Sequence, residues 1–342
     1  MSVQSNKTEK GQQTILTRLG LIVLNNKALF ILIVLCCAIS FGTDIFLQPR
    51  NLLNVIRQIC ISAIIGIGFT YVLTSGNMDL SVGRLLGLIG IIMGRASVSG
   101  WPFWAVILLG IFCGLVCGFL NGIVIVSLKL NPFIVTLATQ QIFKGFSNIL
   151  SSNTTIGNID PMFKAIGQGY FLGIPIPIFI MLGLAGVMWF IMNRTSFGRH
   201  VVAMGGNPEA ARVSGVNIDK TKVLVYMILG LCAALAAIVM NGRLDSAQPT
   251  AGADMEMDSI AAVVLGGTAF TGGIGKVIGT IFGCMIIGVI NNGLNLLNVN
   301  TNWQLVAKGL VIVLAMILDT KSESLLKKAA PVKRPDPYRR KI

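Results

Sequence analysis

AQPTAGADMEMDSIAAVVLGGTAFTGGIGKVIGTIFGCMIIGVINNGLN, residues 247–295, is the segment that decides the fold of this chain. It contains ten glycines and three closely spaced acids, and the remainder is almost wholly apolar. Glycine pairs at 266–267 and 272–273 interrupt the apolar runs, which predicts two short helices that meet at a glycine-rich turn inside a membrane. Irregular backbone at that depth persists only where protein or a water-filled cavity satisfies its polar groups, so the turn predicts a pathway. Close helix packing without a cavity is the alternative, and the four-residue glycine spacing favours it.

The composition of the whole chain agrees with a membrane protein. The 342 residues are 54% hydrophobic and 12% charged, with a mean hydropathy of +0.79. Apolar runs of about 18 to 20 residues, enough to span the hydrocarbon layer, recur along nearly the whole length. We therefore expect an all-α, polytopic integral membrane protein with about ten transmembrane helices, including short or broken ones. The expected division is a polar N-terminal segment (1–27), one transmembrane domain (28–320) and a basic tail (321–342).

Prolines, glycines and polar loops separate the expected spans. Seven spans are expected at about 28–41, 55–73, 80–96, 101–128, 131–150, 174–192 and 223–241, two more within 247–295, and the last at 303–318. The span at 131–150 is unusually rich in threonine and glutamine and contains Lys144. Such groups are costly against lipid, so we expect that helix to face a cavity or other helices.

Basic residues indicate the orientation. Placing the N-terminus inside puts most of the 27 lysines and arginines at cytoplasmic ends, as the positive-inside rule requires. Both termini are then cytoplasmic. Because topology accounts for the net charge of +14, we expect no nucleic-acid partner; the basic tail is expected to contact anionic membrane lipid.

Two glycine-rich stretches are similar to each other. GLVCGFLNG (114–122) and GCMIIGVINNG (283–293) each precede the next expected span by ten residues. In the expected topology the first runs inward and the second outward, which predicts an inverted repeat whose interface holds a substrate site. A chance match is the alternative.

Polar side chains beside the glycine interruptions are the candidate pathway residues. Asp79 in GNMDLSVGR (76–84) is expected to cap the helix that follows it, and it can line a pathway as well. Asparagines that hold helices together are the competing interpretation of the amides. The candidate pathway set is Asp79, Asn121, Asp258, Asn291, Asn292 and Asn295.

The longest internal hydrophilic stretch, residues 193–222, contains the signals of a short helix. Asn207 is a favoured N-cap, Pro208 suits the first helical position, and Gly215 suits the position after the last turn. The surrounding arginines and lysines place this helix in the cytoplasm.

No pattern in the chain indicates catalysis, a metal or a nucleotide. The seven cysteines lie in apolar runs without metal-ligand spacing, and His200 is the single histidine. Gly275–Lys276 lacks the remaining positions of a phosphate-binding loop. We therefore expect no enzyme activity, no metal and no cofactor on this chain.

Several long motifs resemble those of a known family. GNMDLSVG (76–83), MGGNPEAARVSGVNIDKTK (204–222), AQPTAGADMEMDSIAAVVLGGTAFTGG (247–273), VINNGLNLL (289–297) and KGLVIVLA (308–315) occur in this order. They resemble the ribose-type permeases of bacterial ATP-binding-cassette importers over residues 28–320. The resemblance implies an inner-membrane subunit that pairs with a second permease copy, identical or paralogous. It also implies ATP bound by separate ATPase subunits, and a monosaccharide delivered by a periplasmic or lipid-anchored binding protein.

The same resemblance assigns a role to the short helix. Its implied ATPase-coupling loop is Gly206, Asn207, Pro208, Glu209, Ala210, Ala211, Arg212 and Gly215. The chain departs from the family at Asn77–Met78, where Gly-Ile is usual, at Arg84, and in its longer tail. An ion-coupled secondary transporter and a permease for another small polar solute, such as a nucleoside, remain alternatives. Because the acids lie mostly at span ends, a permease driven by a partner is favoured over ion coupling.

Overall fold

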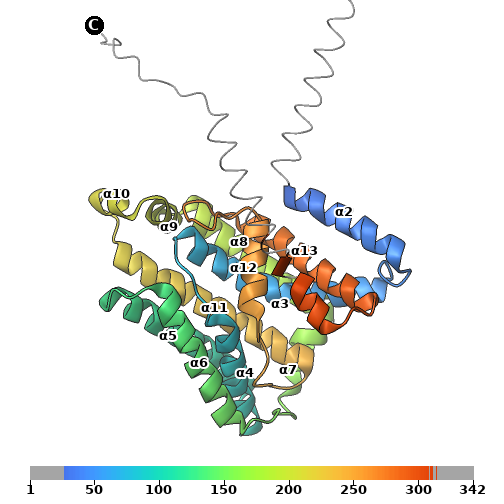
Figure 1. Ribbon diagram of the computed structural model, residues 1–342. Helices are drawn as coiled ribbons and strands as arrows, with labels where there is room; N and C mark the ends of the chain where they lie inside the picture. The colour runs from blue at the N-terminus through green and yellow to red at the C-terminus, as the bar shows by residue number, and fades with distance from the viewer. Residues whose placement is uncertain (1–26, 308, 311–312, 314–342) are drawn as a thin grey trace, which may run out of the picture.

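The computed structural model describes residues 27–307, 309, 310 and 313, and it is almost entirely helical (Figure 1). The helices are α2 (Lys27–Gly42), α3 (Pro49–Thr74), α4 (Val82–Val98), α5 (Phe103–Ser127), α6 (Pro132–Ser151), α7 (Pro161–Gln168), α8 (Ile176–Arg194), α9 (Ser196–Gly206), α10 (Pro208–Val213), α11 (Ile218–Leu244), α12 (Met255–Leu265) and α13 (Val277–Leu296). Strands β1 (Tyr170–Phe171) and β2 (Ile174–Pro175) form a small antiparallel hairpin between α7 and α8. Residues 301–307 are also helical.

Five helices of the described chain are long and apolar enough to cross a membrane, namely α3, α5, α8, α11 and α13. The others are shorter or more polar, so the prediction of a polytopic all-α protein with short and broken helices is confirmed. The tail at 321–342 and the N-terminal segment at 1–26 lie outside the described residues. Helices α7 and α9 were not predicted, because each lies in a stretch that the sequence analysis treated as a polar loop.

The long helix α11 runs the length of the bundle and defines its two ends (Figure 1). Its start follows α10, and its last turn packs against α7. We call these the α10 end and the α7 end. Helix α3 begins at the α7 end, where Arg57 donates to the Gln168 carbonyl, and it finishes at the α10 end, where the Thr74 carbonyl accepts from Gly273 N.

Helices α5 and α13 run in opposite directions. Gly122, near the end of α5, lies against Val223 at the start of α11, whereas Gly114 lies further along α11 against Ala234, so α5 is antiparallel to α11. Helix α13 is antiparallel to α3, since Gly288 meets Ile59. This opposition is what the expected inverted repeat requires; the repeat itself stays a prediction.

The contact between α5 and α11 explains the four-residue glycine spacing in α5. A Cβ on Gly114 would overlap the carbonyl of Gly230 and lie 2.9 Å from the Ala234 Cβ. A Cβ on Gly122 would lie 2.8 Å from the Val223 Cα. These distances are shorter than real Cβ atoms allow, so only glycine permits the two backbones to touch.

Residues 247–295 form the expected helix pair, with one difference. Helix α12 has 11 residues, whereas α13 has 20 and is long enough to cross. Eleven residues rise about 16 Å, roughly half of the hydrocarbon thickness, so α12 is a half-span. The turn between them contains Gly267, Gly272 and Gly273 at positive φ, as two glycine pairs predict.

The position of this glycine turn differs from the expectation. Gly273 N donates to the Thr74 carbonyl, and a Cβ on Gly272 would lie 3.0 Å from the Gly76 Cα. A Cβ on Gly205, in the last turn of α9, would overlap the Thr74 carbonyl. The glycines of the turn therefore allow three backbone segments to pack together at the α10 end, and whether they also border a pathway stays a prediction.

Helices α4 and α12 begin beside each other and run to opposite ends of the bundle. The Gly252 carbonyl and the Glu256 carboxylate lie against Gly83 in the first turn of α4. From there α4 runs to the α7 end, where Ser97 accepts from Asp160 N, and α12 runs to the glycine turn at the α10 end. Two helix starts thus meet inside the bundle.

Candidate functional site

Asp79 and Asn121 form one buried polar cluster at the start of α4. The Asp79 Oδ1 accepts from Ser81 N at 2.6 Å, Ser81 Oγ at 2.7 Å and Val82 N at 3.1 Å. Asn121 on α5 donates to Ser81 Oγ at 2.9 Å and to Asp79 Oδ2 at 3.5 Å. The carboxylate accepts from amides at the helix start as expected, but the helix begins at Val82 and its N-cap position is Ser81, not Asp79. Asp79 is 3% exposed and already holds several donors, so a structural role accounts for its carboxylate.

A second buried carboxylate, Glu256, approaches the same helix start from α12. Its Oε1 accepts from Gln140 Nε2 of α6 at 2.8 Å, and its Oε2 lies against Gly83 with no hydrogen-bond partner among the described residues. Gln140 thereby satisfies the expectation that polar residues of α6 face other helices. The next residue, Gln141, and Lys144, one turn after Gln140, are exposed in the single subunit, contrary to that expectation.

Asp258 and Asn291 meet at a different place, a cavity of about 230 Å³ between α3, α11, α12 and α13. The coil that precedes α12 closes one side of it. Its polar lining consists of Gln58, Ser62, Arg243, Thr250, Asp258 and Asn291. Apolar side chains complete the wall, with Ile59 from α3, Met240 from α11 and Ile287 from α13 among them.

The two remaining asparagines of the candidate set lie elsewhere and hold segments together. Asn292 and Asn51 exchange amide hydrogen bonds at 3.0 and 2.9 Å, which ties α13 to the first turn of α3. Asn295 is exposed and accepts from Gln304 Nε2 at 2.9 Å. For these two residues, the helix-joining interpretation fits the contacts better than a pathway. The six candidates therefore separate into one capping cluster, one cavity and two structural links.

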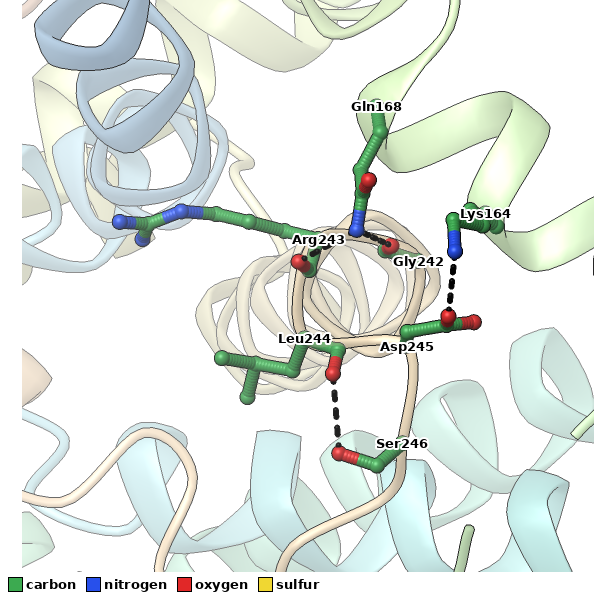
Figure 2. Close-up of polar contacts among 7 residues, drawn as sticks. All are labelled: Lys164, Gln168, Gly242, Arg243, Leu244, Asp245 and Ser246. Carbon is green, nitrogen blue, oxygen red and sulfur yellow. Dashed lines mark hydrogen bonds and ion pairs between the residues drawn. The ribbon is translucent and has the colours of Figure 1, made fainter. Parts of the chain in front are cut away.

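Side chains of α7 bind the last turn of α11 (Figure 2). Gln168 Nε2 donates to the carbonyls of Gly242 and Arg243 at 3.4 and 3.0 Å, and Lys164 pairs with Asp245 at 2.7 Å. The Arg243 side chain extends away from Lys164 and Asp245 (Figure 2). The backbone of Arg243 is thus fixed, and Arg243 is one of the residues that line the cavity.

Helix α10, to which the resemblance assigns a coupling role, has the predicted local structure. In α10, Asn207 Oδ1 accepts from Ala210 N at 3.0 Å, Pro208 is the first residue, and Gly215 follows the last turn with φ +86°. Glu209 and Arg212 are exposed, while Ala211 packs with Met204 of α9 and Ile218 of α11. Because α9 precedes α10 and ends against the glycine turn, α10 is linked to the bundle through direct backbone contacts.

Sequence reasoning missed Glu256 and Arg243 as site residues. Glu256 lies two residues from both Asp254 and Asp258, and in a helix that spacing turns a side chain about 200° away. Helical geometry thus separates Glu256, which faces α6, from Asp258, which faces the cavity. The signal for Arg243 was weaker, because a basic residue near a helix C-terminus is explained by the helix dipole alone.

Comparison with known proteins identifies the family. The profile described as "Branched-chain amino acid transport system / permease component" matches residues 51–316. The ribose import permease RbsC of Bacillus subtilis (strain 168) is 43% identical over 298 residues, which cover 86% of this chain and 92% of the relative.

More distant relatives are named for other sugars. The D-allose permease AlsC of Escherichia coli (strain K12) is 36% identical, covering 82% of this chain and 86% of the relative. The xylose permease XylH of Haemophilus influenzae is 33% identical, covering 83% and 92%. No solved structure matches the chain. The chain therefore belongs to the family of branched-chain amino acid transport system permease components, among its ribose-type sugar permeases.

Proposed function

We propose that this chain is the membrane subunit of an ATP-binding-cassette importer and forms the translocation pathway for a monosaccharide, a ribose-like pentose or a hexose. The observation that carries the proposal is the similarity to import permeases named for ribose, allose and xylose, which extends over more than four fifths of the chain. All three are small, uncharged polyols. Such a cargo suits a bundle whose inner polar groups are mainly amides and hydroxyls, together with buried carboxylates of Asp79 and Glu256 that accept hydrogen bonds from such groups.

The α10 end is the proposed docking surface for a separate ATPase subunit, which binds the ATP. Helix α10 is short, capped and exposed, with Val213 89% exposed at its last position. A rigid helix of this kind can transmit force because its first turn is fixed by Asn207 and its neighbour α9 abuts Thr74. The positive-inside rule supports a cytoplasmic position for this end and for both chain termini.

The α7 end then faces the periplasm and receives sugar from a binding protein, soluble or lipid-anchored. A second permease copy, identical or paralogous, completes the membrane unit in the bacterial inner membrane. Support for a second copy comes from exposed Gln141 and Lys144 in α6, since a charge is costly against lipid and is expected to be covered by protein or water. The tail at 321–342 is proposed to contact anionic lipid.

Uptake of radiolabelled sugar by cells that express the chain with its cognate ATPase and binding protein tests the proposal. We expect uptake of at least one of ribose, allose and xylose, and its loss when the ATPase carries a mutated nucleotide site. A protonophore applied under conditions that preserve cellular ATP should leave uptake intact. Uptake that survives the ATPase mutation and collapses with the protonophore would instead establish an ion-coupled transporter.

A matched pair of variants tests the role of α10. Gly215→Pro is expected to abolish uptake at normal membrane levels, because proline requires φ near −65° and cannot adopt +86°. The control, Gly186→Ala on α8, introduces a Cβ with no atom within 4 Å outside the loop and should transport at the parent rate. Parent-like uptake in both variants would exclude this loop from the coupling mechanism.

A further inference from the structure

We propose that the cavity between α3, α11, α12 and α13 is a monosaccharide-binding site within a single subunit, where Arg243 and Asn291 recognise sugar hydroxyls. The inference rests on the proposed sugar transport and deepens it by assigning residues. The cavity lies in the half of the bundle nearer the α7 end. The coil that precedes α12 passes beside it.

The unpaired side-chain oxygen of Asn291 is the first observation that points to a ligand. Asn291 is 9% exposed, and its Oδ1 is buried without a hydrogen-bond partner among the described residues. A buried acceptor that remains unpaired costs about 1–3 kcal/mol, so such groups in folded proteins normally have a partner. Asn291 lines the cavity, and a hydroxyl placed there would supply that partner.

The charges of the lining favour an uncharged ligand. The charged side chains of the lining are Arg243 and Asp258, and the other polar groups are neutral amides and hydroxyls. One positive and one negative side chain leave the lining without net charge. A polyol, which both donates and accepts hydrogen bonds, matches this mixed set better than an anion or a cation would.

The volume of the cavity suits a ligand with one small ring. Binding sites for drug-sized molecules measure about 300–1,000 Å³, and this cavity of about 230 Å³ lies just below that range. Ile59, Met240 and Ile287 provide apolar surface for the C–H faces of a ring.

Arg243 is positioned for this role by contacts outside the cavity. Gln168 fixes its backbone carbonyl from α7, and the neighbouring Arg57 is engaged separately by the Gln168 carbonyl at 2.7 Å and the Tyr170 ring at 4.6 Å. The Arg243 side chain leaves the helix on the side away from Lys164 (Figure 2). Within the described chain it forms no ion pair, so its donors remain available to a ligand.

Ordered water is the simplest competing occupant. At about 30 Å³ per molecule in the liquid, the cavity volume corresponds to roughly eight waters, and water would also satisfy Asn291. The two occupants differ in one measurable respect. A site filled only with water does not discriminate a sugar from its deoxy analogue, whereas a site that binds the hydroxyl does.

The experiment compares uptake of the best-transported sugar among ribose, allose and xylose with uptake of its mono-deoxy analogues, using the complete importer. Each result is expressed as the ratio of sugar to analogue, which does not depend on the amount of permease. Selection by the binding protein is the same for every variant and cancels. We test Asn291→Leu, which removes the amide at similar volume, and Arg243→Gln. The matched control is Asn292→Leu, which loses the same amide on the same helix outside the cavity.

We expect Asn291→Leu and Arg243→Gln each to change the ratio for at least one analogue about two- to tenfold, the effect of one lost hydrogen bond. The control should keep the parent ratio. If Asn291→Leu does not reach the membrane, Asn291→Ala gives the same readout without overpacking. Parent ratios in both cavity variants, or an equal change in Asn292→Leu, would overturn the site while leaving the proposed function in place. A parent importer that takes up none of the three sugars would instead overturn the proposed function.

Discussion

The glycine contact between α5 and α11 supports a quantitative prediction for Gly114→Ala. The new Cβ would lie 2.9 Å from the Ala234 Cβ and 3.1 Å from the Gly230 carbonyl carbon, where ordinary contacts begin at 3.4 Å. The helices must therefore separate by about 0.5 Å or more along a contact that runs most of their length. Backbone atoms cannot rotate away as a side chain can. We expect the free energy of unfolding to fall by about 1–3 kcal/mol, the usual cost of overpacking.

Reversible unfolding by titration with SDS in mixed micelles measures this loss. The control is Gly186→Ala on the exposed face of α8, where a Cβ meets no atom within 4 Å. It should be neutral or stabilising by up to about 1 kcal/mol, because alanine favours a helix more than glycine does. Gly122→Ala should fall between the two, since its single backbone clash lies near a helix end that can splay. Equal stabilities for Gly114→Ala and Gly186→Ala would refute the argument that close backbone approach requires these glycines.

Three further predictions concern other contacts. A double-mutant cycle on Asn51 and Asn292 should give a coupling energy of about 0.6–2 kcal/mol in SDS unfolding, and additive single effects would exclude the amide pair as a tie. Glu256→Leu should destabilise the protein by about 1–3 kcal/mol more than Glu256→Gln, because only leucine leaves the α6 amide unpaired; equal losses would contradict this. Single cysteines replacing exposed Val213 and Leu172, in a background without native cysteines, should react with impermeant maleimide from opposite sides of the membrane; labelling from one side would contradict the assigned ends.

Local signals predicted the structure where neighbouring residues decide it. The Asn207–Pro208 start and Gly215 end of α10 depend only on capping and backbone angles, and they appear in the structure as expected. The glycine pairs likewise predicted a turn. What surrounds the turn was not predictable, because its partners Thr74 and Gly205 are distant in sequence.

In the candidate site too, local sequence predicted some features, and contacts between distant residues decided the others. Glycine-flanked asparagines marked a polar region correctly, but composition alone could not tell Asn291, which lines the cavity, from Asn292, which ties two helices. Adjacent residues in a helix point about 100° apart, so their environments depend on how the helix is rotated against its neighbours. That rotation is set by packing over the whole bundle.

The opposed starts of α4 and α12 have an electrical consequence. Each helix carries a dipole equivalent to about half an elementary charge at either end, and these two dipoles point away from each other along the bundle. Moving one elementary charge through a membrane potential of 100 mV changes its free energy by about 2.3 kcal/mol. Each dipole is neutral as a whole, and the two arginines of α4 (Arg84 and Arg95) balance the two acids of α12 (Glu256 and Asp258) in formal charge, so a displacement of α4 and α12 as a unit transfers almost no net charge across the membrane. The voltage of an energised cell therefore neither drives nor resists such a movement, and the work of opening a path between them can be set by the docked subunits alone.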